Sequence, residues 1–147
     1  MSKSLISGFY PGGETVLNIE TIVQKCITVA GNIYDIDISF KSKSTNIFVL
    51  GSAKEIVPEI AQMLDYVCLS GRDVVVELEE DEANRMAYLT IMSGQSVEKE
   101  ILSFELYRGI PDSVISDIDT EEDLDECIKD SFEKVNFVRK KLGEIKR

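Results

Sequence analysis

Residues 14–26, ETVLNIETIVQKC, contain the start of the first helix that the sequence predicts. Asn18 precedes a run, Ile19 to Ala30, in which apolar residues recur at the spacing of one helical face. Asn18 is the expected N-cap of this helix, and Thr21 lies three residues on. Gly31 follows the run and is expected to end the helix, because glycine readily adopts the left-handed conformation of a C-cap.

Strands are predicted on both sides of this helix. Residues 3–10 alternate weakly between apolar and polar side chains and end at a Pro-Gly-Gly turn. Residues 33–40 alternate more clearly, as in a strand that is buried on one side only. Residues 46–50, after the polar stretch KSKST, are the expected return strand of a hairpin.

A second helix is predicted over residues 53–69. Ser52 and Glu55 match the capping box, in which each side chain accepts a hydrogen bond from a backbone N–H at the helix start. Pro58 lies about a turn and a half inside this helix, where its missing N–H predicts an adjusted first turn or a kink. Gly71 marks the expected end.

The second half of the chain predicts a strand over 73–78 and then an ambiguous segment, 84–93. This segment fits a helix or the second strand of a hairpin. We favour the helix, because acids at 80–82 suit a helix N-terminus. Residues 97–107 predict a short helix, and a long one begins near Thr120. The apolar positions of the long helix recur at spacings of three and four: Leu124, Ile128, Phe132, Val135, Val138 and Leu142.

Composition narrows the classes of function. The net charge of −11, from 27 acids and 16 bases, argues against binding to nucleic acid or to anionic lipid, which requires Lys and Arg. No apolar run reaches the roughly 20 residues of a membrane span, and the N-terminus has no signal-peptide core. The sequence therefore predicts a soluble cytoplasmic protein without a membrane partner.

Residue types that carry common chemistry are scarce. The chain has no histidine, so the commonest general base and zinc ligand are missing. Its three cysteines, at 26, 68 and 127, have no metal-binding spacing, and Cys26 and Cys68 stand among apolar residues, as core side chains do. The acidic stretch 117–126 does not match a calcium loop, which needs Gly at its sixth position and Glu at its twelfth.

The order of elements over residues 3–92 resembles that of HPr, the histidine-containing phosphocarrier of the bacterial sugar phosphotransferase system. Leu17, Asp35–Ile38, Ser52–Lys54 and Leu69–Gly71 stand where that family has similar residues. The resemblance implies an α+β fold, an open-faced β-sandwich with an antiparallel four-stranded sheet and helices on one face.

Residues 95–147 have no counterpart in that family. We therefore expect an HPr-like domain over 1–94 and a helical extension over 95–147, packed on the same domain. Two roles are open for the extension: it covers the open face of the sheet, or it mediates self-association into a homo-oligomer.

The phosphocarrier motif itself is absent. The family has Gly-Leu-His-Ala/Thr-Arg-Pro where this chain has residues 16–21, VLNIET. Asn18 replaces the phosphate-accepting histidine, and Glu20 replaces the arginine and would repel phosphate. Glu55 stands at the family's regulatory serine, where its carboxylate resembles a phosphate in charge. The simpler interpretation of Glu55 is the acid of the capping box.

The first functional hypothesis is a non-catalytic, HPr-like regulatory or protein-binding module without cofactor or metal. Its partner-binding surface would comprise two helix starts: Asn18, Glu20, Thr21, Lys54 and Glu55. The alternative is a small acidic chaperone or immunity-type protein that sequesters a basic client through stretches 77–82 and 117–126. An enzyme is the third hypothesis, and no spacing of Cys, Lys or carboxylates supports it.

Overall fold

The computed structural model describes residues 16–43, 47–70, 73–93, 99–107 and 121–146. The predicted strand over 3–10 lies outside these residues. In chain order the elements are β1 (Val16–Asn18), α2 (Ile19–Tyr34), β2 (Ile38–Ser42), β3 (Phe48–Leu50), α3 (Ala53–Ser70), β4 (Val74–Asp81), β5 (Met86–Ser93), β6 (Lys99–Leu106) and α4 (Glu121–Lys146).

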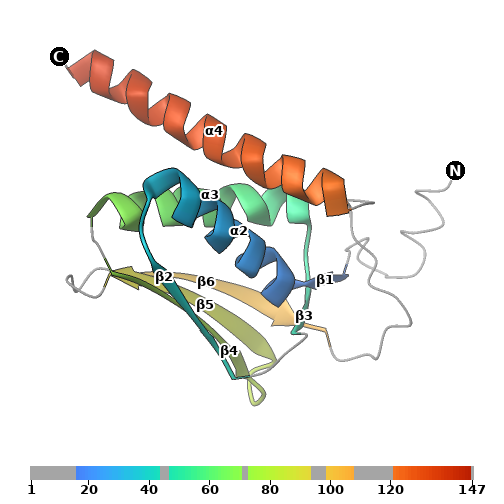
Figure 1. The fold of residues 1–147 in the computed structure, drawn as a ribbon. Coiled ribbons are helices and arrows are strands. Elements are labelled where there is room, and N and C mark those ends of the chain that lie inside the picture. Colours follow the sequence, from blue (N-terminus) through green and yellow to red (C-terminus); the bar gives the residue numbers. More distant parts are fainter. Residues whose placement is uncertain (1–15, 44–46, 71–72, 94–98, 108–120, 147) are drawn as a thin grey trace, which may run out of the picture.

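The strands form one six-stranded sheet in the order β1-β3-β6-β5-β4-β2 (Figure 1). Neighbouring strands are antiparallel except β2 and β4, which are parallel. The α+β class is thus confirmed, whereas the four-stranded antiparallel sheet expected from the phosphocarrier resemblance is wrong. The sheet is larger, and its edge strand β2 makes it mixed.

The predicted hairpin of residues 33–40 with 46–50 is also wrong. β2 pairs with β4 at one edge of the sheet, whereas β3 lies between β1 and β6. Helix α2 takes up the start of the predicted strand, because it passes Gly31 and ends at Tyr34, with Asp35 as a left-handed C-cap (φ 53°). The extra turn lets the Tyr34 side chain contact the other helices, which local sequence does not reveal.

A glycine sets the start of α3. Gly51 has a φ of 155°, which side chains rarely permit, and a Cβ there would lie 2.9 Å from the Cδ1 atom of Ile56. The carbonyl oxygen of Ser52 accepts hydrogen bonds from the backbone N–H groups of Glu55 (3.1 Å) and Ile56 (2.9 Å). From there α3 runs without a break through Pro58.

The favoured helix over 84–93 is wrong, because this segment is strand β5 and forms a hairpin with β4. In the turn, the Asp81 carboxylate accepts hydrogen bonds from the backbone N–H (3.2 Å) and the side-chain Nδ2 (2.7 Å) of Asn84. Arg85 adopts a left-handed φ of 55° before β5 begins. The acids therefore order a turn and do not start a helix.

The predicted helix over 97–107 is wrong as well. β6 lies inside the sheet, paired with β5 along its length and with β3 at its end. Phe104 and Leu106 are buried while Ser103 and Glu105 are exposed, the alternation of a strand that faces the core on one side. Part of the predicted helical extension is thus a strand of the same sheet.

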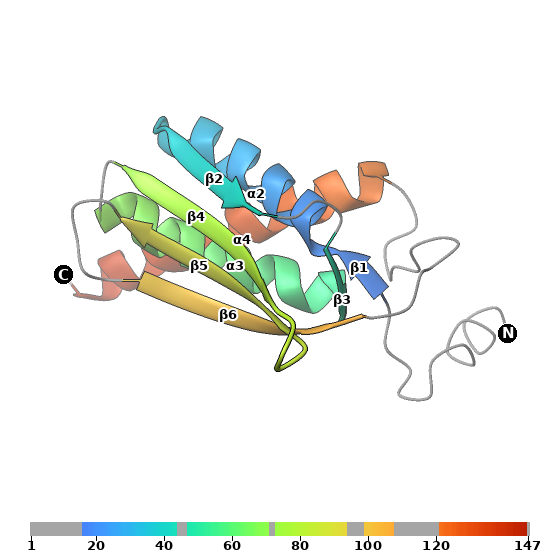
Figure 2. The ribbon, with the colours of Figure 1, turned by 90° about the horizontal axis from the view of Figure 1, so that it is seen from below.

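The three helices build two layers above one face of the sheet (Figures 1 and 2). Helices α2 and α3 contact the strands, and α4 packs across both of these helices. Ile128 and Phe132 of α4 are fully buried, with Leu124 and Val135 packed against the core, as predicted. Val138, which its spacing also assigns to this face, is 54% exposed.

Helix α4 lies on α2 and α3, on the same side of the sheet as these helices, and so does not cover the opposite face of the sheet.

A polar contact joins α2 to α3 within the helical layers. The Tyr34 hydroxyl donates a hydrogen bond to the carboxylate of Asp65, which is buried on α3. The Tyr34 ring also meets the Phe132 ring of α4 edge-on, with centroids 6.4 Å apart and planes at 64°. Tyr34 therefore links the end of α2 to both of the other helices.

Removing the Tyr34 hydroxyl should destabilise the protein. We expect Tyr34→Phe to lower the free energy of unfolding in urea by about 1–3 kcal/mol, because it takes one donor from a buried carboxylate. Tyr88→Phe, on the other side of the sheet, is the matched control and should change stability by less than about 0.5 kcal/mol. Equal stability of Tyr34→Phe and wild type would contradict this role.

Asn84 should control the ionisation of Asp81. Its side-chain hydrogen bond, followed by its backbone N–H, lowers the pKa of Asp81. Because the folded pKa lies below the unfolded one, the turn contributes stability above the unfolded pKa and loses it as the pH falls through the folded pKa. In Asn84→Ala, an NMR titration should show the pKa of Asp81 returning towards its ordinary value. An unchanged titration would show that Asn84 is not the cause.

Candidate functional site

The predicted partner-binding residues lie at two helix starts. Asn18 ends β1 and caps α2: its Oδ1 atom accepts a hydrogen bond from the backbone N–H of Thr21 at 3.2 Å. The predicted N-cap is therefore confirmed. Glu20 is half-buried in the first turn of α2, and Thr21 is exposed.

Lys54 and Glu55 are both exposed in the first turn of α3. The two helix starts follow neighbouring strands, since β1 pairs with β3 and Asn18 is the register partner of Phe48. The strands are antiparallel, so the chain leaves them at opposite ends of their pairing. The role of these helix starts in partner binding stays a prediction.

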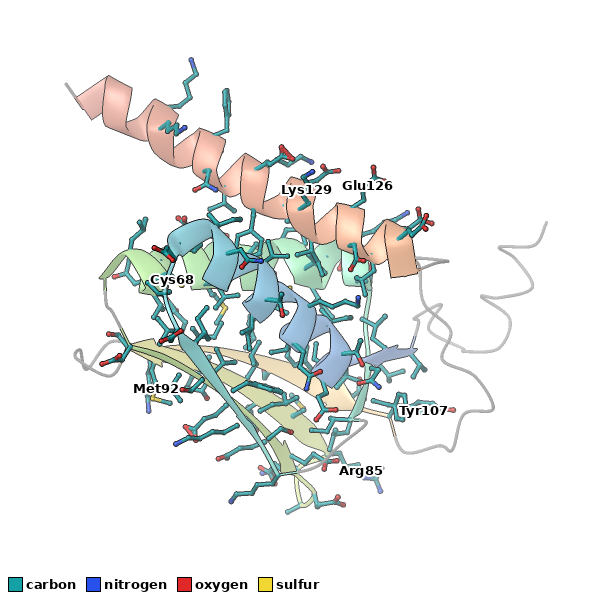
Figure 3. All side chains as sticks on the ribbon, viewed as in Figure 1. Cys68, Arg85, Met92, Tyr107, Glu126 and Lys129 are labelled. Carbon is teal, nitrogen blue, oxygen red and sulfur yellow. The ribbon has the colours of Figure 1, made fainter. Side chains whose placement is uncertain are left out.

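The sheet face opposite the helices is a second candidate surface, which we call the open face. Register pairing places Glu77 beside Thr90, Glu79 beside Tyr88, and Tyr88 beside Ser103. The residues of β5 on the helical side are buried, whereas those on the open face are only partly covered. Figure 3 shows Met92 on this side of the sheet, away from the helices.

Neutral side chains run along the middle of the open face. Strand β5 contributes four of them: Met86, Tyr88, Thr90 and Met92. Val75 lies beside Met92 on β4, and Ile101 lies beside Thr90 on β6, with 52% of Ile101 exposed. Methionine and tyrosine are adaptable contact residues, and both are enriched in protein interfaces.

Charged side chains border this neutral strip on both sides. Strand β4 carries Glu77, Glu79 and Asp81 on the open face, and β6 carries Glu105. Lys41 of β2 lies beside Glu77, and Lys99 of β6 lies beside Met92. The face thus combines an apolar centre with predominantly acidic margins.

The predicted acidic stretch 77–82 is divided by the pleat of β4. Glu77, Glu79 and Asp81 lie on the open face, and Leu78 points into the core. Of the other predicted stretch, 117–126, the described part lies at the start of α4. There Asp125 accepts a hydrogen bond from the Lys25 side chain at 3.0 Å, in an ion pair between α4 and α2.

The described surface includes depressions at the ends of two helices. One, of about 540 Å³, lies between the last turns of α2, the loop 35–37 and the start of β2 at Ile38. The other, of about 380 Å³, lies at the start of α4 among Glu122, Asp123, Asp125, Glu126 and Lys129. Within the described residues, no group of three or more Cys, Asp or Glu side chains is arranged to hold a metal ion.

The cysteines are arranged as core residues. Burial raises the pKa of the Cys26 thiol to about 12, with a smaller contribution from nearby Cys127. Burial, and then the charge of Asp65, raises the pKa of Cys68 to about 12. Both are free thiols, and so is the partly exposed Cys127. Cys26 and Cys68 are therefore protonated and unreactive at neutral pH, as expected of small core side chains.

Sequence reasoning missed the open face because it assigned two of its strands to helices. The burial of residues 86–93 alternates, with Ala87, Leu89, Ile91 and Ser93 buried. Their sequence does not, because Met86, Tyr88 and Met92 on the open face are apolar as well, so the period of two that is typical of a strand with one buried side is hidden.

Comparison of the chain with protein-family models, with curated proteins and with solved structures found no match. In the described part of the chain, no helix combines the length and the apolar composition needed to span a bilayer.

The thiols should differ in reactivity. A thiol-reactive disulfide reagent added to the folded protein should modify Cys127 first, since thiolate formation at Cys26 and Cys68 is suppressed and both are buried. In Cys127→Ser, the fast phase should disappear and the two other thiols should react only on unfolding in urea. Rapid reaction of Cys26 or Cys68 in the folded state would contradict this description.

Proposed function

We propose that this protein is a non-catalytic protein-binding module that holds a basic, amphipathic segment of a partner protein on the open face. The observation that carries the proposal is the one-sided covering of the sheet. All three described helices lie on one side of the sheet. The other side presents the neutral strip, with carboxylates of β4 and β6 on either side of it.

The chemistry of the open face defines the partner. Apolar side chains of the partner would contact Met86, Tyr88 and Met92, where removal of apolar surface from water favours binding. Lys or Arg side chains would lie over Glu77 and Glu79. The chain's net charge of −11 would attract a basic segment over a distance and accelerate its association.

This proposal combines parts of the two binding hypotheses drawn from the sequence. It keeps a non-catalytic binding module from the first and a basic client from the second. It does not use the phosphocarrier resemblance, because the sheet differs from the one which that resemblance implies. It also places the partner-binding surface on the strands of the open face, and not at the two helix starts.

A displayed library of random 15-residue peptides provides a direct test. We expect the protein to select peptides that combine apolar residues with Lys or Arg, and their affinity to fall with added salt. Glu77→Lys/Glu79→Lys should weaken a selected peptide about tenfold or more, equivalent to about 1.4 kcal/mol. Glu55→Lys/Glu59→Lys, the same charge change at exposed positions of α3, is the matched control and should leave affinity nearly unchanged.

Two outcomes would count against the open face. If both double variants weaken the peptide equally, the attraction is a property of overall charge. If the selected peptides are acidic or carry no charge, the partner chemistry is wrong. Circular dichroism of each variant checks that the fold is retained.

A further inference from the structure

Helix α4 has a charge distribution that divides it into two halves. Residues 121–130 contain six acids and one base, whereas residues 131–146 contain five bases and two acids. Among these, Glu122, Glu126 and Lys140 are exposed. One helix therefore presents an acidic first half and a basic second half on the surface.

The second half of α4 also carries exposed apolar residues, and one of them, Phe137, lies on the outward side of the helix. Phe137 is 61% exposed and Val138 is 54% exposed, two of the six large apolar side chains exposed in the described part of the chain. The Lys141 ammonium lies 5.6 Å from the centre of the Phe137 ring. The inward side of α4 is filled by Ile128 and Phe132, which are buried.

Interactions within one chain explain only part of this pattern. Acids at a helix N-terminus and bases at its C-terminus complement the helix dipole, but this effect is confined to the first and last turns. Exposed Glu122, Glu126 and Asp130 follow one another at i, i+4, a spacing at which like charges repel within one helix. The dipole also gives no reason for Phe137 to face solvent. Helix α4 is the outer layer of the fold, so the described part of the chain places no element over its outward side (Figure 1).

We propose that the outward side of α4 binds the same helix of a second copy of this chain, in antiparallel orientation. A twofold axis through the middle of the helix would place the acidic half of each copy against the basic half of the other, at both ends. A parallel pair would place acids against acids and bases against bases. Charge complementarity therefore selects a second copy, and it selects the antiparallel arrangement.

Phe137 fits the same arrangement. Helix α4 has 26 residues, or about 39 Å at 1.5 Å per residue, so its midpoint lies between residues 133 and 134. Phe137 lies about one turn beyond this midpoint. In an antiparallel pair it would therefore lie opposite Lys129 and Asp130 of the other copy, about one turn from the axis, where its ring would lose contact with water.

The dimer would leave the open faces accessible. The α4 layer and the open face lie on opposite sides of the molecule (Figures 1 and 2). Two copies joined through α4 would therefore present two open faces outward. The dimer itself does not depend on what the open face binds, so the two proposals fail separately.

Sedimentation velocity of the full chain tests the pairing. We expect wild type to sediment as a dimer at low ionic strength and to dissociate with added salt. Glu122→Lys/Glu126→Lys and Lys140→Glu/Lys141→Glu should each weaken self-association at least tenfold, because each places like charges at both ends of the pair. An equimolar mixture of the two variants should restore the dimer, since opposite charges face each other again.

Each contrary result has a definite meaning. A wild type that stays monomeric at the highest soluble concentration would overturn the proposal. Dimers that persist in both charge variants would place the interface elsewhere. Failure of the mixture to dimerise, with both variants folded by circular dichroism, would exclude the antiparallel arrangement. Phe137→Ser, which alters an exposed side chain, should weaken the dimer without changing the charge.

Discussion

The structure depends on the burial of one side of the sheet beneath two helices. Along β4 and β5, every second side chain is buried, from Val74 to Leu78 and from Ala87 to Ser93. Helices α2 and α3 supply the matching apolar surface. Since a β-strand alternates its side chains strictly, burial of one set directs the other set away from the helices. The open face is thus a direct consequence of how the core forms.

Helix α4 adds a second layer of helix on the same side of the sheet as α2 and α3. Helix α4 contacts α3 and α2, where Phe132 meets Tyr34 and Asp125 pairs with Lys25. The molecule therefore has two distinct outer surfaces. One is made by strands and has an apolar strip between acids, and the other is a helix whose charge reverses along its length. Because the two surfaces lie on opposite sides of the molecule, binding at the open face does not depend on self-association through α4.

The wrong assignments share a physical cause. In residues 84–93, the acids at 80–82 favour a helix N-terminus, and residues 97–107 are likewise predicted as a helix from local sequence alone. The free energy of that effect is small, about 0.3–1 kcal/mol, and pairing of β5 with both β4 and β6 outweighs it. Likewise, Gly31 does not end α2, because Tyr34 gains contacts with Asp65 and Phe132 one turn later. In each case, contacts with residues distant in the sequence determined the secondary structure of the segment.

The sequence by itself determined the local features: the Asn18 cap, the approximate positions of α2, α3 and α4, the inward side of the first half of α4, and the core role of Cys26 and Cys68. These follow from capping chemistry and from periodicity within a few turns, which act between near neighbours in the chain. Only the tertiary structure decided the order of the strands, the parallel pairing of β2 with β4, and the open face. Strand order depends on contacts between distant segments, and a strand's own residues do not specify which neighbour it will have.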